Sequence, residues 1–112
     1  MSDCLFCRIV KGEIPSAKVA ESETCLAFRD IAPKAPVHVL VIPKVHFDSL
    51  NEVPDGRVVG EMALLVGAVV RSEGLAAKGY RCVINTGVDG GQTVGHLHLH
   101  VLGGRGLKWP PG

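Results

Sequence analysis

Residues 95–104 read GHLHLHVLGG, and this stretch carries three of the five histidines of the chain at alternate positions. Side chains two residues apart on a β-strand share a face, so His96, His98 and His100 are expected on one face and the apolar residues between them on the other. The outer two histidines would lie about 13 Å apart on a regular strand, too far to bind one metal ion together. The pattern therefore indicates covalent chemistry by an imidazole, one or two metal ligands, or a polar strand face.

The segment before these histidines, NTGVDGGQTVG at residues 85–95, is rich in glycine. Glycines allow several backbone N–H groups to converge on an anion, and Thr93 can add a hydroxyl. Such a loop followed by neutral imidazoles would suit chemistry at phosphorus, where donors hold the oxygens and a nucleophile attacks. For the loop taken alone, an ordinary glycine turn is the alternative.

Length and composition favour one globular domain over residues 1–112. The net charge is +1, from 12 Lys and Arg against 11 Asp and Glu, which does not favour a nucleic-acid-binding protein. The apolar stretch MALLVGAVV is too short to span a bilayer, and no secretory signal is recognisable. Four cysteines without such a signal indicate a reducing compartment, predicted to be the cytoplasm. Two of them, Cys25 and Cys82, lie in apolar segments and are predicted to be buried.

Short strands and one long helix account for the rest of the pattern. The segment CLFCRIVKG at 4–12 predicts one or two helical turns. Apolar residues at helical spacing between Val58 and Val69 predict the long helix, with Asp55 as its N-cap and its end near Gly74. Strands are predicted over residues 18–22, 25–30, 37–44, 80–85 and 96–104. Consecutive strands around one helix indicate an α+β fold with a mostly antiparallel sheet.

Several segments together resemble the histidine triad (HIT) superfamily of nucleotide hydrolases and transferases. The stretch HLHLHVL carries its His-x-His-x-His pattern, while CLAFRDIAPKAPVHVLVIPK, NTGVDGGQTVGHLHLHVLGG and the terminal WPPG resemble the Hint branch, the purine nucleoside phosphoramidases. The resemblance implies a five-stranded sheet with one long and one short helix, and a homodimer with a ten-stranded sheet. It also implies hydrolysis of AMP–amine conjugates through a covalent nucleotidyl-histidine, with AMP or GMP bound and with no nucleic-acid or membrane partner and no organic cofactor.

By this resemblance His98 is the nucleophile and His100 binds a nonbridging phosphate oxygen. A neutral imidazole suits the first role, and its Nδ1–H should donate to a backbone carbonyl so that Nε2 faces phosphorus. The backbone at Gly91 and Gln92 and the hydroxyl of Thr93 would complete the phosphate cradle beside the leaving nitrogen. The family more often has serine where Thr93 stands.

The resemblance also implies a nucleotide pocket. The residues that match its apolar purine slot are Phe6, Ile9, Phe28 and Ile31. Asp30 matches the carboxylate that accepts from the ribose hydroxyls, Asn85 matches a polar residue beside the ribose, and Trp109 is expected to reach the partner subunit's site. His38 is expected to form a hydrogen bond near the triad. In the alternative reading, Phe28 and Ile31 are core residues, Asp30 forms a turn, and His38 is a core histidine.

The spacing Cys4-x-x-Cys7 is typical of zinc ligands but supplies only half of a tetrahedral site. His46 and His96 resemble the remaining ligands of zinc-bearing bacterial members of the family. A closed Cys2His2 set would be structural. Zinc on His96, the first residue of the catalytic triad, would leave the chemistry to His98 and His100. Two buried thiols without a metal are the alternative, and a redox pair is a weaker one.

A nucleotide-binding scaffold dimer with incidental hydrolysis is the alternative function, because the same pocket would serve it. Replacing His98 with alanine distinguishes the two, since only an enzyme loses an important activity while AMP binding persists. A zinc hydrolase with the triad as ligands is a third hypothesis, and the strand spacing counts against it.

Overall fold

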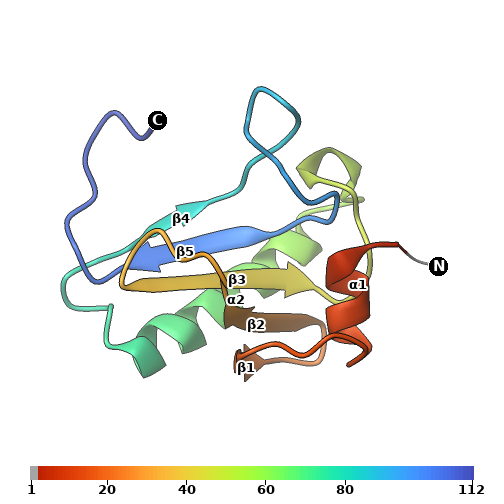
Figure 1. The fold of residues 1–112 in the computed structure, drawn as a ribbon, viewed down its shortest axis with the longest axis horizontal. Coiled ribbons are helices and arrows are strands. Elements are labelled where there is room, and N and C mark those ends of the chain that lie inside the picture. Colours follow the sequence, from red (N-terminus) through yellow and green to blue (C-terminus); the bar gives the residue numbers. More distant parts are fainter. Residues whose placement is uncertain (1–2) are drawn as a thin grey trace.

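The computed structural model describes residues 3–112 as a five-stranded sheet with two α-helices and one 3₁₀ turn (Figure 1). In chain order the elements are α1 (Leu5–Val10), β1 (Lys18–Glu21), β2 (Cys25–Arg29), β3 (Val37–Pro43), the 3₁₀ turn (Leu50–Glu52), α2 (Arg57–Glu73), β4 (Arg81–Val83) and β5 (Leu99–Gly103). The strand order is β1-β2-β3-β5-β4, and every neighbouring pair is antiparallel. The predicted α+β fold, with one long and one short helix, is confirmed.

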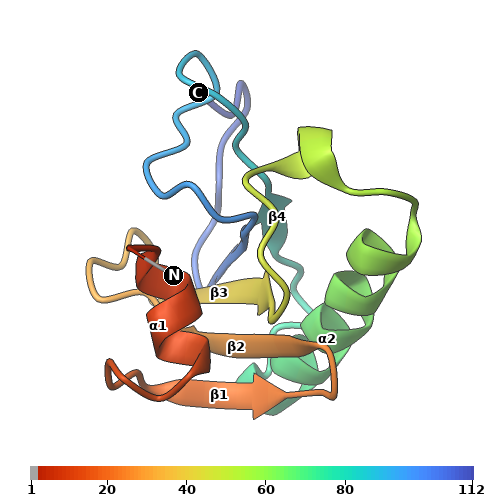
Figure 2. The same cartoon turned by 90° about the vertical axis from the view of Figure 1, so that its right-hand side faces the viewer.

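The two helices cover opposite faces of the sheet (Figure 2). Alternate residues of β3 explain this arrangement, because successive side chains of a strand point to opposite faces. Val39 and Val41 pack under α2 in the larger core cluster. Leu40 and Ile42 face α1 and pack with Phe6 in a second cluster. The functional candidates lie on this second, thinner side, where the short helix leaves part of the sheet uncovered (Figure 2).

The ends of α2 differ slightly from the prediction. Gly74 ends the helix as predicted, with a left-handed φ of 72° that favours glycine. The N-cap is Gly56, so the assignment of Asp55 to that position was wrong by one residue. The Asp55 carboxylate nevertheless accepts a hydrogen bond from the N–H of Arg57 at 2.8 Å.

The last strand is shorter than predicted, because it begins at Leu99 and leaves His96 and His98 before it. Leu99 pairs with Val41, so continuing the register would place Leu97 opposite Pro43. Proline has no N–H to donate. The Leu97 N–H instead donates to Phe47 O, and strand pairing stops there.

The two cysteines assigned to the core behave differently. Cys25 is 1% exposed, as predicted. Cys82 is exposed, because β4 is an edge strand of only three residues, and the prediction that it is buried was wrong. All four cysteines are free thiols.

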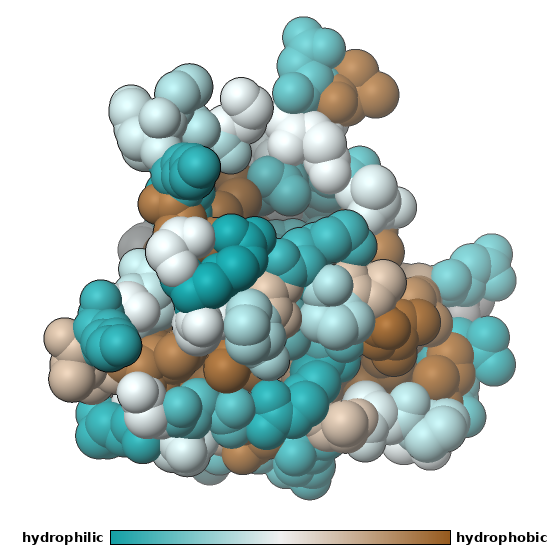
Figure 3. Space-filling model, turned by 60° about the vertical axis from the view of Figure 1, so that its left-hand side comes forward, coloured by the Kyte–Doolittle hydropathy of each residue, from teal (hydrophilic) through white to brown (hydrophobic). Residues whose placement is uncertain are grey.

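Figure 3 shows one side of the surface, where hydrophilic residues predominate and apolar residues occur in small groups. This mixture is ordinary for a globular domain. Among residues 3–112, no helix is long and apolar enough to cross a membrane.

Candidate functional site

The three alternating histidines lie on the face of the sheet that α1 partly covers. His100 pairs with Leu40, whose side chain faces α1. The rings of His98 and His100 are neighbours, with their centroids 5.0 Å apart. His96 and His98 are 0% and 4% exposed, which excludes the interpretation of these histidines as a solvated polar face.

The orientation of His98 is set by a backbone carbonyl two residues earlier. Its Nδ1 lies 2.7 Å from His96 O, and a carbonyl oxygen accepts only, so the neutral ring carries its proton on Nδ1. No hydrogen bond within residues 3–112 involves its Nε2. The lone pair on Nε2 is therefore available as a nucleophile, which is the tautomer expected from the sequence.

His100 receives the opposite tautomer through a relay of two hydrogen bonds. The backbone N–H of Lys34 donates to His38 Nδ1 at 3.0 Å, so the proton of His38 lies on Nε2. That nitrogen lies 2.9 Å from His100 Nδ1 and donates to it. The proton of His100 therefore lies on Nε2, which is buried and has no hydrogen-bond partner within the described chain.

Burial keeps this pair neutral. Desolvation is the main cause that lowers the pKa of His100 to about 4, followed by the repulsion that a protonated His98 would exert on it. Desolvation also lowers the pKa of His38, against a smaller opposing effect of Asp30. A buried N–H with no partner is unfavourable unless a ligand accepts from it, so His100 Nε2–H can bind an anionic oxygen beside the His98 nucleophile.

Asp30 lies beside this relay and also forms a turn. Its Oδ1 accepts from the Ala32 N–H at 2.8 Å, and its Oδ2 lies 3.4 Å from His38 Nε2. Asp30 therefore forms the turn named in the alternative reading, and it also lies beside the His38–His100 pair. The adjacent Ile31 side chain is fully exposed, so it is a surface group and the alternative placement of Ile31 in the core is excluded.

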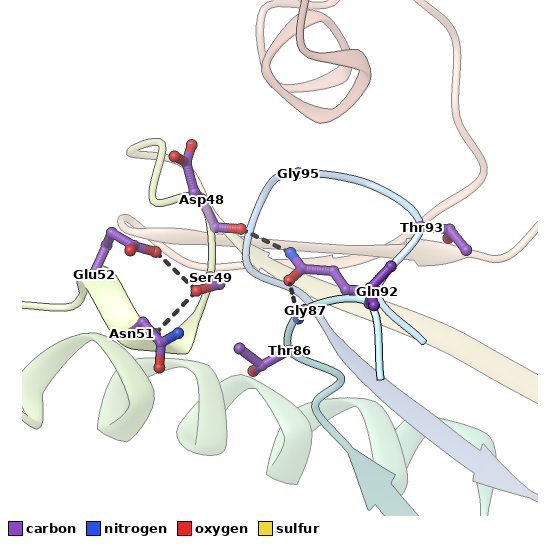
Figure 4. Close-up of a pocket in the computed structure, with 10 residues that line it drawn as sticks. Asp48, Ser49, Asn51, Glu52, Thr86, Gly87, Gln92, Thr93 and Gly95 are labelled. Atoms are coloured by element: carbon purple, nitrogen blue, oxygen red, sulfur yellow. Dashed lines mark hydrogen bonds between the residues drawn. The ribbon is translucent and has the colours of Figure 1, made fainter. Parts of the chain in front are cut away.

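The glycine-rich loop is held by the side chain of Gln92, as Figure 4 shows. Its Nε2 donates to Asp48 O at 2.7 Å and to Val94 O at 3.0 Å, and its Oε1 accepts from the Gly87 N–H at 3.1 Å. The groove between this loop and residues 48–52 has a volume of about 580 Å³. Gln92 thus fixes the loop against the segment that follows β3.

The backbone of Gln92, which the sequence suggested for a phosphate cradle, takes part in the turn of the loop. Its N–H already donates to Gly87 O at 3.0 Å, which closes the turn. Within residues 3–112, no backbone carbonyl accepts from the N–H groups of Thr93 or Val94. These two N–H groups, beside the Thr93 hydroxyl, are therefore available to donate to an anionic ligand.

The residues of the expected nucleotide pocket range from buried to exposed. Phe6 and Phe28 are each 4% exposed and pack edge to face with centroids 5.6 Å apart, so they belong to the core under α1 as well as to the face of the triad. The half-buried members are Ile9 and Asn85. Trp109 is 80% exposed in the isolated chain, and Gly91 has a left-handed φ of 80°.

Four side chains converge at the start of α1, next to the triad. The ligand atoms of Cys4, Cys7, His46 and His96 all lie within 4.8 Å of one another. The two Nδ1 atoms lie 3.1 Å apart. Cys4 Sγ lies 3.3 Å from His96 Nδ1, and Cys7 Sγ lies 3.3 Å from His46 Nδ1 and 3.6 Å from His96 Nδ1. A tetrahedral zinc site with ordinary bond lengths has edges of about 3.3–3.8 Å. The sulfur–nitrogen separations lie in this range and the nitrogen–nitrogen separation lies slightly below it, so a small shift of the rings would give a Cys2His2 site.

The tautomers of the two histidines support a cation at this cluster. His96 Nε2 donates to Pro43 O at 2.9 Å, and His46 Nε2 lies 2.7 Å from a carboxylate oxygen of Asp48. Both Nδ1 atoms then carry lone pairs that face each other, which repel unless a cation or proton lies between them. Asp30, His38 and His100 also converge, but there a shared proton explains the contact.

Sequence reasoning missed three groups of this site. Asp48, which orients His46, stands two residues after it, and this spacing was a usable signal. The backbone groups Pro43 O and Lys34 N–H are invisible in sequence because every residue but proline carries both. His38 was expected near the triad, and it lies in direct contact with His100.

Comparisons with known proteins agree with this geometry. The family model described as the HIT domain matches residues 11–107. An uncharacterised HIT-like protein of Synechococcus elongatus is 54% identical over 98% of this chain and 97% of its own. The crystal structure of a HIT family hydrolase from Legionella pneumophila is 47% identical, with a TM-score of 0.95 over 98% of this chain and 100% of that one.

A histidine triad protein from Clostridium difficile is 44% identical, with a TM-score of 0.93 over 96% of each chain. The relative and the two solved structures each cover 96% or more of this chain, and the family model spans the three alternating histidines. The chain belongs to the HIT domain family.

Proposed function

We propose that this protein is a HIT hydrolase of the Hint type, which cleaves the P–N bond of purine nucleoside 5′-phosphoramidates to AMP or GMP and an amine. The observation that carries the proposal is the hydrogen bond from His98 Nδ1–H to His96 O at 2.7 Å. It leaves a neutral imidazole with its free lone pair on Nε2, as nucleophilic catalysis requires.

In the first step His98 Nε2 forms a bond to phosphorus, and the P–N bond breaks with its electron pair going to the amine, which takes up one proton. The ring becomes cationic as it is nucleotidylated, and donation from Nδ1–H to a carbonyl stabilises that charge. In the second step water attacks phosphorus, its proton is released, and His98 leaves as the neutral imidazole. Two displacements, each with inversion, give net retention at phosphorus.

His100 would hold a nonbridging oxygen through its unpartnered Nε2–H. The negative charge on these oxygens increases toward the transition state, and preorganised donors in a buried site stabilise it strongly. The N–H groups of Thr93 and Val94 and the Thr93 hydroxyl would donate from the loop side. The extra methyl of threonine beside the leaving nitrogen would affect the choice of amine.

The nucleoside would lie along the α1 side of the sheet. The apolar groups proposed for the purine are Phe6, Ile9, Phe28 and Ile31. The exposed Ile31 supports this assignment, because a bound base would cover it. Asp30 retains carboxylate lone pairs for the ribose hydroxyls beyond its turn contact, with Asn85 proposed beside the ribose and phosphate and Gly91 in the loop.

We also propose that Cys4, Cys7, His46 and His96 hold a structural Zn²⁺. Bound there, the ion would link α1 to the end of β3 and to the triad segment, with all four positions taken by the protein. Desolvation and the neighbouring Cys4 raise the pKa of the Cys7 thiol, so a cation is needed to stabilise the thiolate form.

A homodimer through the free edge of β4 is part of the proposal. β4 has one neighbour in the sheet, and unpaired strand edges are ready to extend a sheet. Trp109, exposed in the single chain, would then contact the partner subunit's site. Four free thiols are compatible with the reducing cytoplasm as the location.

The decisive experiment uses an AMP phosphoramidate whose second step is slow, followed by intact and peptide mass spectrometry. We expect one adenylate per chain on the peptide that carries His98, and neither adduct nor turnover in His98→Ala. AMP binding in that variant should persist. If AMP binds tightly but no phosphoramidate is cleaved by the unmodified protein, the chain is a nucleotide-binding module and the proposed activity is wrong.

A further inference from the structure

His96 contributes to two sites with two different groups. Its side-chain Nδ1 belongs to the cysteine–histidine cluster, 3.3 Å from Cys4 Sγ and 3.1 Å from His46 Nδ1. Its backbone oxygen accepts the Nδ1–H of His98 at 2.7 Å. The residue that would bind the metal is therefore the same residue that sets the tautomer of the nucleophile.

Helix α1 makes a second connection between the cluster and the nucleophile. Cys4 is the N-cap of this helix and Cys7 lies within it, so both cluster thiols are held by a single short element. Phe6, between them, packs edge to face on His96 with centroids 5.8 Å apart and on His98 with centroids 5.2 Å apart. Any displacement of α1 would move the ring that confines the nucleophile.

The cluster holds this segment together with two other anchors, the His96 Nε2–H donated to Pro43 O at 2.9 Å and the buried Leu97 side chain. His96 and His98 precede β5, so no strand pairing of the sheet fixes their backbone. The Leu97 N–H donates to Phe47 O at 2.7 Å, and Phe47 follows the cluster residue His46. A helix of six residues is too short to be stable alone, so α1 depends on the packing of Phe6 and on the contacts of Cys4 and Cys7 in the cluster.

We infer that the Cys4, Cys7, His46 and His96 cluster, when it binds a metal, positions the catalytic nucleophile, with His96 and Phe6 as positioning residues that couple the two sites. The inference rests on the proposed nucleophilic role of His98, but the coupling itself is a property of the fold. Metal loading would then determine the rate of the chemical step without changing the groups that contact the nucleotide.

The test compares the tautomer of His98 in zinc-loaded and metal-free protein at one fixed neutral pH. Long-range ¹H–¹⁵N spectra of the histidine rings distinguish Nδ1–H from Nε2–H directly and need no substrate. With one equivalent of zinc we expect His98 in a single Nδ1–H form. Removing the metal by chelation, or weakening the site with His46→Ala, should give a mixture of tautomers whose populations follow zinc occupancy.

Kinetics provide the second readout. Loss of an outer residue that orients a site typically costs about 10–100-fold in activity, so kcat should fall by about that factor in the metal-free protein with little change in KM. Cys25→Ala is the matched control, since it removes a buried thiol outside the cluster. Cys7→His, which keeps four potential ligands, should retain both the Nδ1–H tautomer and kcat when it is loaded with zinc.

Each outcome decides the inference. A single Nδ1–H tautomer in folded metal-free protein would overturn it, and so would a metal-free chain that unfolds as a whole, because the metal would then support the entire fold. If the tautomer follows zinc occupancy but no phosphoramidate is cleaved at any loading, the coupling stands and the proposed hydrolase activity fails.

Discussion

The Nε2 atom of His38 lies 2.9 Å from the Nδ1 atom of His100, although 62 residues separate the two histidines in the chain. On the other side of the His38 ring, the backbone N–H of Lys34 donates to Nδ1. One backbone N–H therefore determines, through His38, that the His100 proton lies on Nε2. The site acquires a neutral donor with a fixed direction, and the nearby Asp30 adds a carboxylate at 3.4 Å from His38.

Replacing His38 with alanine should lower kcat by about tenfold or more, since His100 would then adopt either tautomer. The loss should be smaller than the roughly 10²–10³-fold cost of removing a transition-state donor altogether. Steady-state kinetics with an AMP phosphoramidate measure this change. Lys34→Ala is the control, because it removes the side chain and keeps the N–H that donates to His38. An equal loss in both variants would contradict the relay.

The alternating residues predicted which side chains share a face of the strand, because strand periodicity is a local property that sequence records. Leu99 and Val101 pack under α2 while His100 faces α1, as that periodicity requires. The extent of the strand was not predictable in the same way. It ends where Pro43 would have to donate a hydrogen bond, and this depends on the register between distant segments.

Contacts between segments distant in the sequence explain the remaining differences. Cys82 lies in an apolar segment, but its strand became the edge of the sheet, and strand order depends on the whole topology. The role of Gln92 was assigned to its backbone, whereas its side chain spans the loop to Asp48. The ligand set at α1 was named from resemblance, and only the structure brings His46 and His96 to 3.1 Å.

Stability should fall as the pH decreases from about 6.5 to about 4, in part because of His100. Folding lowers the pKa of His100 from 6.5 to about 4, so in that window the unfolded chain binds a proton that the folded chain does not. The contribution of His100 to the free energy of unfolding is therefore fully present above pH 6.5 and is lost as the pH falls toward 4. Chemical denaturation at a series of pH values measures it.

His38 and His96 contribute to the same trend, since burial lowers the pKa of each. The contribution of His100 is isolated by His100→Gln, which should give a shallower decrease between the same two pH values. A decrease of unchanged steepness in this variant would contradict the assigned pKa direction.

Replacing Gln92 with glutamate should destabilise the glycine-rich loop. The change removes the two hydrogen bonds donated to Asp48 O and Val94 O and sets a carboxylate against both carbonyls. Leaving such groups unsatisfied costs about 1–3 kcal/mol, measured as the free energy of unfolding. Asn51→Asp is the control, because it introduces the same charge in the same groove. A loss of similar size in both variants would show that the added charge is responsible and that the two hydrogen bonds donated by Gln92 are not.

Replacing Asp48 with asparagine should weaken zinc binding by about 10–100-fold, the usual effect of losing a carboxylate that orients a metal-binding histidine. Asp48 accepts from His46 Nε2–H at 2.7 Å, which keeps the His46 lone pair on Nδ1 and directed at the cluster. Competition with a chromophoric chelator measures the affinity, and the four proposed ligands remain present in the variant.

Glu52→Gln is the matched control for this change, since it removes an equal charge from the same surface groove but contacts Ser49 and no cluster residue. Zinc affinity should be unchanged there. If both variants lose affinity equally, the effect is a general electrostatic one and Asp48 has no orienting role. If neither does, the His46 tautomer is set without the carboxylate, and Asp48 gives no support for a cation or proton between the two Nδ1 atoms.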